Sequence, residues 1–176
     1  RCNDCFYCDS GWTGEFLYFV NCEAERAKVD GFYINGGEFI SIDNCFSCSN
    51  YRDGIRIDGN TTTSVSITNP NVRLTGGHGI NHQSGGLQDL SIVNPRIGGN
   101  NADDPDDPDD GQGYAGEGNA NTYSGIRLAN GTHNVYIGGG KSGGNGNLGG
   151  SAPFSQRAGV SIEGTTLSSK SEEFTT

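Results

Sequence analysis

The sequence predicts an all-β protein, a right-handed parallel β-helix (solenoid) with coils of about 23–25 residues and inserted loops. Three observations support this prediction. The 176 residues include 30 glycines and no methionine, and only 32% are hydrophobic, which favours short strands and turns over helices. A short pattern of alternating apolar residues recurs along the chain. A second apolar pattern follows most copies of the first at a nearly constant distance.

The first strand of each predicted coil follows a small or polar residue and a glycine. The pattern occurs as DGFYI (30–34), DGIRI (53–57), HGINH (78–82), SGIRL (124–128) and AGVSI (158–162). Alternation with a period of two places every second side chain on the same face of a strand. We therefore expect inward-facing stacks that contain Phe32, Ile34, Ile55, Ile57, Ile126 and Leu128. The opposite face should carry an outward row formed by Tyr33, Arg56, Asn81, Arg127 and Ser161.

The second strand of each predicted coil begins at a nearly constant offset from the coil glycine, as FISI, VSIT, LSIV and VYIG. An asparagine ends this strand at three evenly spaced positions, Asn44, Asn69 and Asn94, and Asn21 precedes them at a similar interval. One coil cannot bury its own inner row, so it must stack on the next with equivalent strands parallel. The usual hand of such crossovers makes the helix right-handed. An open meander would not explain the constant spacing.

Two stretches interrupt the repeat and are expected to be inserted loops. Residues 99–123 are rich in Asp, Pro and Gly, and residues 141–157 form the second insertion. The Asp/Pro tract matches neither the EF-hand nor the Gly-Gly-x-Gly-x-Asp calcium pattern, so we expect a solvated loop. Residues 1–176 are expected to be a single β-helix segment, and a fragment of a longer chain because it begins at Arg1.

The charge balance limits the partners of the protein. Eleven basic and 21 acidic residues give a net charge of −10, which disfavours nucleic acid and anionic membranes and suits a neutral or cationic ligand. The sequence contains no apolar run long enough to span a bilayer, so no membrane insertion is expected. No cofactor is predicted.

All six cysteines lie in the N-terminal part of the chain, the last of them at Cys48. The Cys-x-x-Cys pairs at Cys5/Cys8 and Cys45/Cys48 have the spacing of a zinc site. However, Cys22 and Cys45 each follow a repeat asparagine, and we expect Cys5 to occupy the same place one coil earlier. The two pairs would then lie two coils apart, about 9 to 10 Å, too far for one zinc. We therefore predict a stack of buried cysteines and no metal site, and leave a disulfide of the Cys5–Cys8 type open.

The candidate catalytic residues are Asp30, Asp53 and His78, which precede the coil glycine in successive coils. Ser124 occupies the same place one coil later, and we expect this column to be exposed at a turn. His82 should point inward as a structural residue, because it is equivalent to Ile57 and Leu128. Asp, Asn, Ser and His before glycine are also ordinary turn residues, so a structural β-helix without activity is an alternative.

The column and its flanking residues resemble the polygalacturonase family of glycoside hydrolases. KVDGF, RDGI, GGHGI and GIRLA stand, within residues 28–129, for its Asn-Thr-Asp, Asp-Asp, Gly-His-Gly and Arg-Ile-Lys motifs. The resemblance implies that Asp30 and Asp53 hold a water and that Arg127 binds a sugar carboxylate. Arg52 replaces the Asp that serves as the general acid in that family, and His78 is the substitute within the column. Lys28 and Ala129 also depart from the motifs.

A broader resemblance is to phage and viral tail spikes and the pectate-lyase-like superfamily, carried by SGIRLANGTHNVYIGGGKSGGNGN (124–147) and AGVSIEG (158–164). It implies a homotrimer or larger assembly, in a virion tail or extracellular, that recognises host-surface polysaccharide; such spikes often cleave the polysaccharide, and versions that only bind it also exist. The substrate-binding residues would be Tyr33, Arg56, Asn81 and Arg127. A polysaccharide-active enzyme, whether a hydrolase, lyase or epimerase, is the alternative, although the Asp-Pro-His-Glu motif of alginate epimerases is absent.

Overall fold

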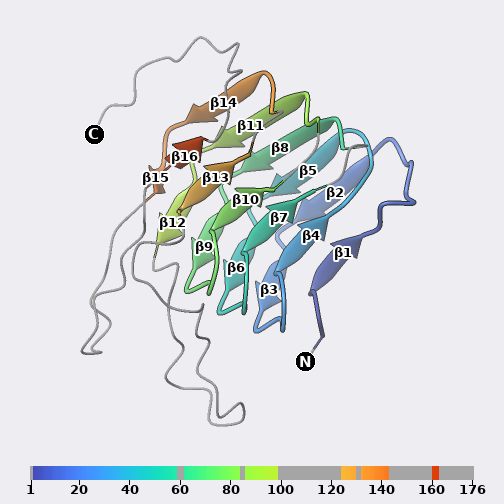
Figure 1. Ribbon diagram of the computed structural model, residues 1–176. Helices are drawn as coiled ribbons and strands as arrows, with labels where there is room; N and C mark the ends of the chain where they lie inside the picture. The colour runs from blue at the N-terminus through green and yellow to red at the C-terminus, as the bar shows by residue number, and fades with distance from the viewer. Residues whose placement is uncertain are drawn as a thin grey trace, which may run out of the picture.

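The computed structural model describes residues 2–58, 62–83, 86–98, 124–129, 132–142 and 160–162, and these form a parallel β-helix (Figure 1). The first coil contains β1 (Phe6–Cys8), β2 (Leu17–Val20) and β3 (Glu23–Glu25). The next two coils contain β4 (Phe32–Ile34), β5 (Ile40–Asp43), β6 (Phe46–Cys48), β7 (Ile55–Ile57), β8 (Ser64–Thr68) and β9 (Asn71–Arg73). The remaining strands are β10 (Ile80–His82), β11 (Asp89–Val93), β12 (Arg96–Gly98), β13 (Ile126–Leu128), β14 (Val135–Gly138), β15 (Lys141–Ser142) and β16 (Val160–Ile162).

Every third strand joins the same sheet, so three sheets run along the helix. Sheet A has the order β1-β4-β7-β10-β13-β16, sheet B has the order β14-β11-β8-β5-β2, and sheet C has the order β15-β12-β9-β6-β3. All pairs are parallel and in register. Over the described ranges the chain is all-β, and no described helix is long and apolar enough to cross a membrane. The all-β parallel β-helix that the repeat predicts is confirmed.

The core lies between the three sheets and is built from the inner position of each strand. The predicted inward stacks of sheet A, from Phe32 to Leu128, are between 0 and 1% exposed. His82 lies in register with Ile57 and Leu128 and is 1% exposed, so its predicted inward position is also confirmed. The Thr132 hydroxyl forms a hydrogen bond with His82 Nδ1, and the two atoms are 2.6 Å apart. Alternation alone therefore determined which side chains enter the core.

The repeat asparagines turn the chain from sheet B into sheet C. Asn21, Asn44, Asn69 and Asn94 all have left-handed backbone conformations, with φ between 49 and 54°. Asparagine tolerates this region better than other residues that carry a Cβ. Their side chains also pair between coils: Asn44 Nδ2 donates to Asn21 Oδ1, and Asn94 Nδ2 donates to Asn69 Oδ1 at 2.9 Å. The glycine at 139 takes the equivalent place in the next coil, with a φ of 66°.

The structure corrects the predicted place of Cys5. Cys22 and Cys45 do align with Pro70 and Pro95, because Glu23, Phe46, Asn71 and Arg96 are register partners. Cys5 instead precedes β1 and aligns with Gly31, because β1 pairs with β4. Cys5 and Cys22 belong to the same coil, before its first and its third strand, so the two cannot occupy equivalent places. The Cys-x-x-Cys pairs consequently lie in adjacent coils and in different sheets, and the predicted stack is limited to Cys22 and Cys45.

The start of the second predicted insertion is also corrected. Lys141 and Ser142 form β15, which pairs with Arg96 and Ile97 of β12. Two successive glycines, Gly139 and Gly140, supply the left-handed turn that leads into this strand, with φ values of 66 and 72°. The rest of that predicted insertion (143–157) and the whole first predicted insertion (99–123) lie outside the described residues.

Candidate functional site

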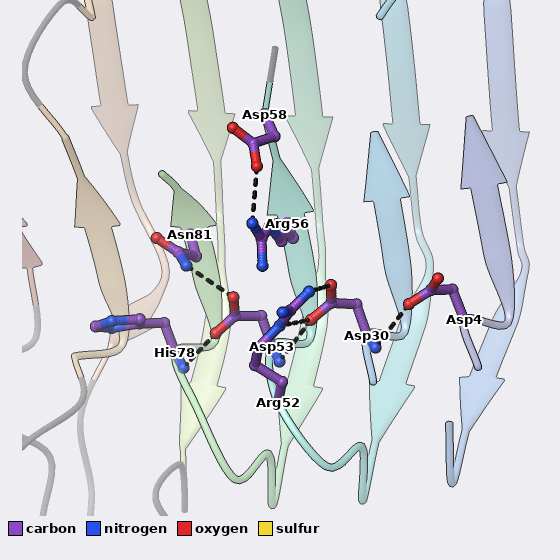
Figure 2. A network of polar contacts seen from close by, with 8 residues as sticks. All are labelled: Asp4, Asp30, Arg52, Asp53, Arg56, Asp58, His78 and Asn81. Carbon is purple, nitrogen blue, oxygen red and sulfur yellow. Dashed lines mark hydrogen bonds and ion pairs between the residues drawn. The ribbon is translucent and has the colours of Figure 1, made fainter. Parts of the chain in front are cut away.

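The predicted catalytic residues lie in one column at the turn that enters sheet A. Asp30, Asp53 and His78 each stand two residues before β4, β7 and β10, so their side chains follow one another from coil to coil (Figure 2). The structure adds Asp4, which stands two residues before β1. The sequence analysis missed Asp4 because a cysteine follows it where the later coils have glycine. Together with Ser124 these residues form the turn column.

The first four side chains of the turn column, from Asp4 to His78, each accept a hydrogen bond from the backbone of the next coil. The N–H of Asp30 donates to Asp4 Oδ1 at 2.9 Å, and the N–H of Asp53 donates to Asp30 Oδ1 at 3.0 Å. The N–H of His78 donates to Asp53 Oδ1 at 2.8 Å, and the N–H of Ser124 donates to His78 Nδ1 at 2.9 Å. The last bond requires His78 Nδ1 to be unprotonated, so the neutral ring carries its proton on Nε2. The column is thus a continuous ladder that ties neighbouring turns together.

The two central carboxylates of the turn column are buried and differ in their partners. Asp30 is 0% exposed. Its carboxylate accepts hydrogen bonds from both Nε and Nη2 of Arg52, and the bond from Nε is 2.9 Å long. Arg52, which stands where the polygalacturonase motif has an Asp, therefore compensates a buried charge in this chain. That hydrogen bond in turn raises the pKa of Arg52.

Among the described residues, no cation is in direct contact with Asp53. It is 1% exposed, and Asn81 Nδ2 donates to its Oδ2 at 2.7 Å. Burial, together with the neighbouring charge of Asp30, raises its pKa to about 6, although the hydrogen bonds from Asn81 and His78 act in the opposite direction. Asp53 can thus take up a proton near pH 6.

The predicted binding row on the outer side of sheet A is in register. Tyr33, Arg56, Asn81, Arg127 and Ser161 follow one another on β4, β7, β10, β13 and β16. Its middle members are not open to solvent, because Arg56 is 9% and Asn81 is 4% exposed.

Polar contacts within the molecule occupy this row. Arg56 Nη2 donates to Asp58 Oδ2 at 2.8 Å, and the guanidinium lies 5.1 Å from the centre of the Tyr33 ring. Arg127 Nη1 donates to Asn81 Oδ1 at 3.1 Å, and this amide also holds Asp53. Figure 2 shows Asn81 and Arg56 side by side above the turn column. Asn81 therefore joins Asp53 of the turn column and Arg127 of the binding row in one polar network.

This network acts first on the stability of the fold. Both oxygens of Asp30 and of Asp53 accept hydrogen bonds from the protein, so these bonds join neighbouring coils in this structure. Over the part of the chain that the structure describes, no three His, Cys, Asp or Glu side chains gather closely enough to hold a metal ion. The chemistry available here is proton uptake by Asp53 and hydrogen bonding between coils.

A second row, on the outer side of sheet B, is open to solvent. It runs in register through Tyr18, Ser41, Ser66, Ser91 and Tyr136, on β2, β5, β8, β11 and β14. Tyr18 is 64% and Tyr136 is 54% exposed, and the three serines between them are half-buried. Figure 1 shows the five strands side by side across this face. We call this set the tyrosine–serine row.

Further aromatic side chains lie beside one end of the tyrosine–serine row. The rings of Phe16 and Phe39 are stacked at 5.3 Å, and the Phe16 ring lies parallel to Tyr18 at 6.4 Å. Both phenylalanines are more than 50% exposed. The alternation in LYFV, FISI, VSIT, LSIV and VYIG contains enough information to predict this face, since its outward members fall between the apolar ones. The sequence predictions rest on the apolar positions of these strands and therefore do not include this face.

Comparisons of this chain with models of protein families, with curated proteins and with solved structures each found no match.

Proposed function

We propose that this chain is a polysaccharide-binding β-helix of the tail-spike kind within the pectate-lyase-like superfamily, and that it binds glycan on the outer face of sheet B. The observation that carries the proposal is the tyrosine–serine row. Exposed aromatic rings stand at both of its ends, and small hydroxyl side chains lie between them. Large exposed apolar groups on a regular face are typical of binding surfaces.

The chemistry of the row suits a chain of sugars. A tyrosine ring offers an apolar face for the C–H side of a pyranose and a hydroxyl at its edge. Serine hydroxyls both donate and accept hydrogen bonds, as sugar hydroxyls do. The coils repeat at about 4.8 Å, close to the length of one sugar unit in an extended polysaccharide. Because the row stands on paired strands, little conformational entropy is lost on binding.

The charge of this face selects the kind of glycan. The two rows that flank the tyrosine–serine row contain Phe16, Phe39, Ser64, Asp89 and Asn134 on one side, and Val20, Asp43, Thr68, Val93 and Gly138 on the other. Neither row includes a lysine or an arginine, and each includes one aspartate. A neutral or amino-substituted polysaccharide therefore fits better than an acidic one, in line with the net charge of −10.

The test is a binding measurement on a panel of neutral, amino-substituted and acidic polysaccharides, by affinity electrophoresis and calorimetry. We expect Tyr18→Ala and Tyr136→Ala each to weaken binding about tenfold or more, since aromatic anchors dominate such interfaces. The matched control is Tyr7→Ala, which removes an equally exposed tyrosine from the outer side of sheet A. Loss of binding in the Tyr7 variant with full binding in the Tyr18 variant would place the site on sheet A and overturn the assignment to sheet B.

A polysaccharide hydrolase is the second candidate function, favoured by the raised pKa of Asp53. Perturbed carboxyl groups concentrate at active sites, and an acid with a pKa of about 6 can donate a proton near neutral pH. On this hypothesis Asp30 and His78 assist Asp53, and Asp53→Asn should abolish the release of reducing sugar from a bound polysaccharide. The Asp9→Asn variant, at an exposed position just after β1, is the control. Equal product release by wild type and Asp53→Asn would exclude Asp53 from catalysis.

The resemblance to tail spikes extends the proposal to the assembly and location of the protein. On this basis the chain belongs to a homotrimer or larger assembly, in a virion tail or extracellular, with a surface polysaccharide as its partner. Sedimentation of the purified chain measures the first point. A monomer over the whole concentration range that can be reached would count against the assembly while leaving the glycan site untouched.

A further inference from the structure

Cys22 and Cys45 occupy equivalent places in adjacent coils. They immediately precede Glu23 and Phe46, which are register partners on β3 and β6. The later coils have Pro70 and Pro95 at this place, so the thiol pair is confined to the first two coils.

The geometry of stacked coils matches the geometry of a disulfide. Equivalent residues on neighbouring parallel strands lie about 4.8 Å apart, within the range of roughly 4.4 to 6.8 Å that a disulfide spans between its Cα atoms. The two residues are already in contact, because the N–H of Cys22 donates to Cys45 Sγ at 3.4 Å. The Cys45 thiol lies 3.4 Å from Phe19 O, on the coil that carries Cys22.

The other cysteines do not offer an equivalent link between coils. Cys8 contacts Gly36 O at 3.5 Å at the end of β1, and Cys48 contacts the hydroxyl of its neighbour Ser49 at 3.3 Å. The thiols of Cys2 and Cys5 lie 3.6 Å apart, but only two residues separate them, so a bond there would close a small local ring. All six cysteines are thiols in this structure.

The two partners differ in access to solvent, which sets the order of reaction. Cys22 is half-buried at the surface of the turn, whereas Cys45 is 2% exposed. Burial raises the pKa of the Cys45 thiol, and the charge and hydrogen bond of the Cys22 thiol raise it further. An external oxidant therefore reaches the Cys22 thiol before the buried Cys45 thiol, and the thiolate form of Cys22 attacks it.

We propose that Cys22 and Cys45 form a disulfide that joins the first coil to the second when the protein meets a small-molecule disulfide such as glutathione disulfide. The Cys22 thiolate attacks the oxidant and releases one glutathione thiolate, which gives a mixed disulfide. The Cys45 thiol then loses its proton and attacks Cys22 Sγ, which releases the second glutathione. The protein loses two protons and two electrons, and one glutathione disulfide becomes two glutathione thiols.

The bond would tie the coil that contains β2 and β3 to the coil that contains β5 and β6. It would link two positions one coil apart in the unfolded chain, which lowers the entropy of that state. Since Cys45 Sγ already contacts the backbone N–H of Cys22 in the native turn, we expect little strain to oppose this gain. We expect the oxidised protein to melt several degrees above the reduced protein.

The experiment exposes the folded protein to glutathione disulfide, blocks the remaining thiols with an alkylating reagent, and maps the peptides without reduction. The expected product is one cross-linked pair that contains Cys22 and Cys45, with a mass two hydrogens lower and a higher melting temperature. Cys22→Ser should remove both the pair and the shift, and Cys48→Ser should retain both. Cys45→Ala is a second variant that leaves a small, apolar side chain at the buried site, and it should also remove both the pair and the shift. Recovery of alkylated Cys45, or of Cys22 only as its glutathione adduct, would overturn the proposal.

Discussion

At the scale of single residues, the turn column shows how one side chain serves two neighbouring coils. A carboxylate that accepts a backbone N–H from the next coil stabilises both turns, and Asp30 also gains the Arg52 guanidinium. Asp53 contacts no cation among the described residues, so its ionised form bears the cost of burial. The positions of Asp30, Asp53 and His78 were predicted from the repeat. Their burial was not, because it depends on Arg52 and Asn81, which reach the column through the fold rather than through the pattern.

The raised pKa of Asp53 makes the stability of the fold depend on pH. Its pKa is about 6 in the folded state against a reference value of 3.8, so the folded state binds the proton more tightly than the unfolded state. The stabilising contribution is therefore complete below the reference value and is lost as the pH rises through the folded value. We expect Asp53 to lower the free energy of unfolding by about 3 kcal/mol between about pH 4 and about pH 7.

Denaturant unfolding across this pH range, in wild type and in Asp53→Asn, measures this contribution. The variant has a neutral side chain at all these pH values, so the decrease should disappear from its profile. It should also be less stable at low pH by about 1 kcal/mol, because its amide meets the amide of Asn81. Parallel profiles for the two proteins would show that Asp53 does not titrate in this range.

At the scale of elements, short strands alternate with turns whose residues are fixed by backbone conformation. The strands were predictable, since alternation and the leading glycine are local features. Cys5 was misplaced because the first coil is longer between its first two strands, from Cys8 to Leu17, than the second coil is from Ile34 to Ile40. The burial of Arg56 in the outer row of sheet A was not predictable either, because it depends on contacts with Asp58 and Tyr33.

The asparagine turn offers a test at this scale. Asn69 has a φ of 49° and accepts a hydrogen bond from Asn94 Nδ2 at 2.9 Å. Asn69→Ala should lower the free energy of unfolding by about 2 kcal/mol, because it loses this bond and because alanine tolerates the left-handed region less well than asparagine does. Asn69→Gly loses only the bond and should cost about 1 kcal/mol or less. Denaturant unfolding of both variants separates the two effects. An alanine variant as stable as the glycine variant would show that the backbone conformation contributes nothing.

At the scale of the whole molecule, stacking converts a weak repeat into one continuous core. Each coil contacts only its neighbours, so the stability is a sum of similar interfaces along the helix. The same repetition brings Tyr18 and Tyr136 into one row, although they are far apart in the sequence. The fold class and its core could therefore be predicted from the repeat, whereas the exposed face of sheet B required attention to the residues between the apolar ones.

The position of a side chain along the stack should determine the cost of removing it. Ile67 and Ile137 occupy the same inner row of sheet B, but Ile67 is 0% exposed between coils on both sides, whereas Ile137 is half-buried. Ile67→Ala loses its full burial and leaves a cavity, so we expect it to cost about 3 to 4 kcal/mol. Ile137→Ala should cost about half as much, because water already reaches this site.

Denaturant unfolding monitored by circular dichroism compares these two variants, and amide exchange locates the effect. Faster exchange in Ile67→Ala should be greatest in β5, β8 and β11, because contacts act between neighbouring coils, and smaller in β2, which lies one coil further away. Equal losses of stability in the two variants, with uniform exchange, would mean that the whole stack unfolds as a single unit. A gradient of exchange rates along the stack is expected instead, because each coil is held only by the coil on either side of it.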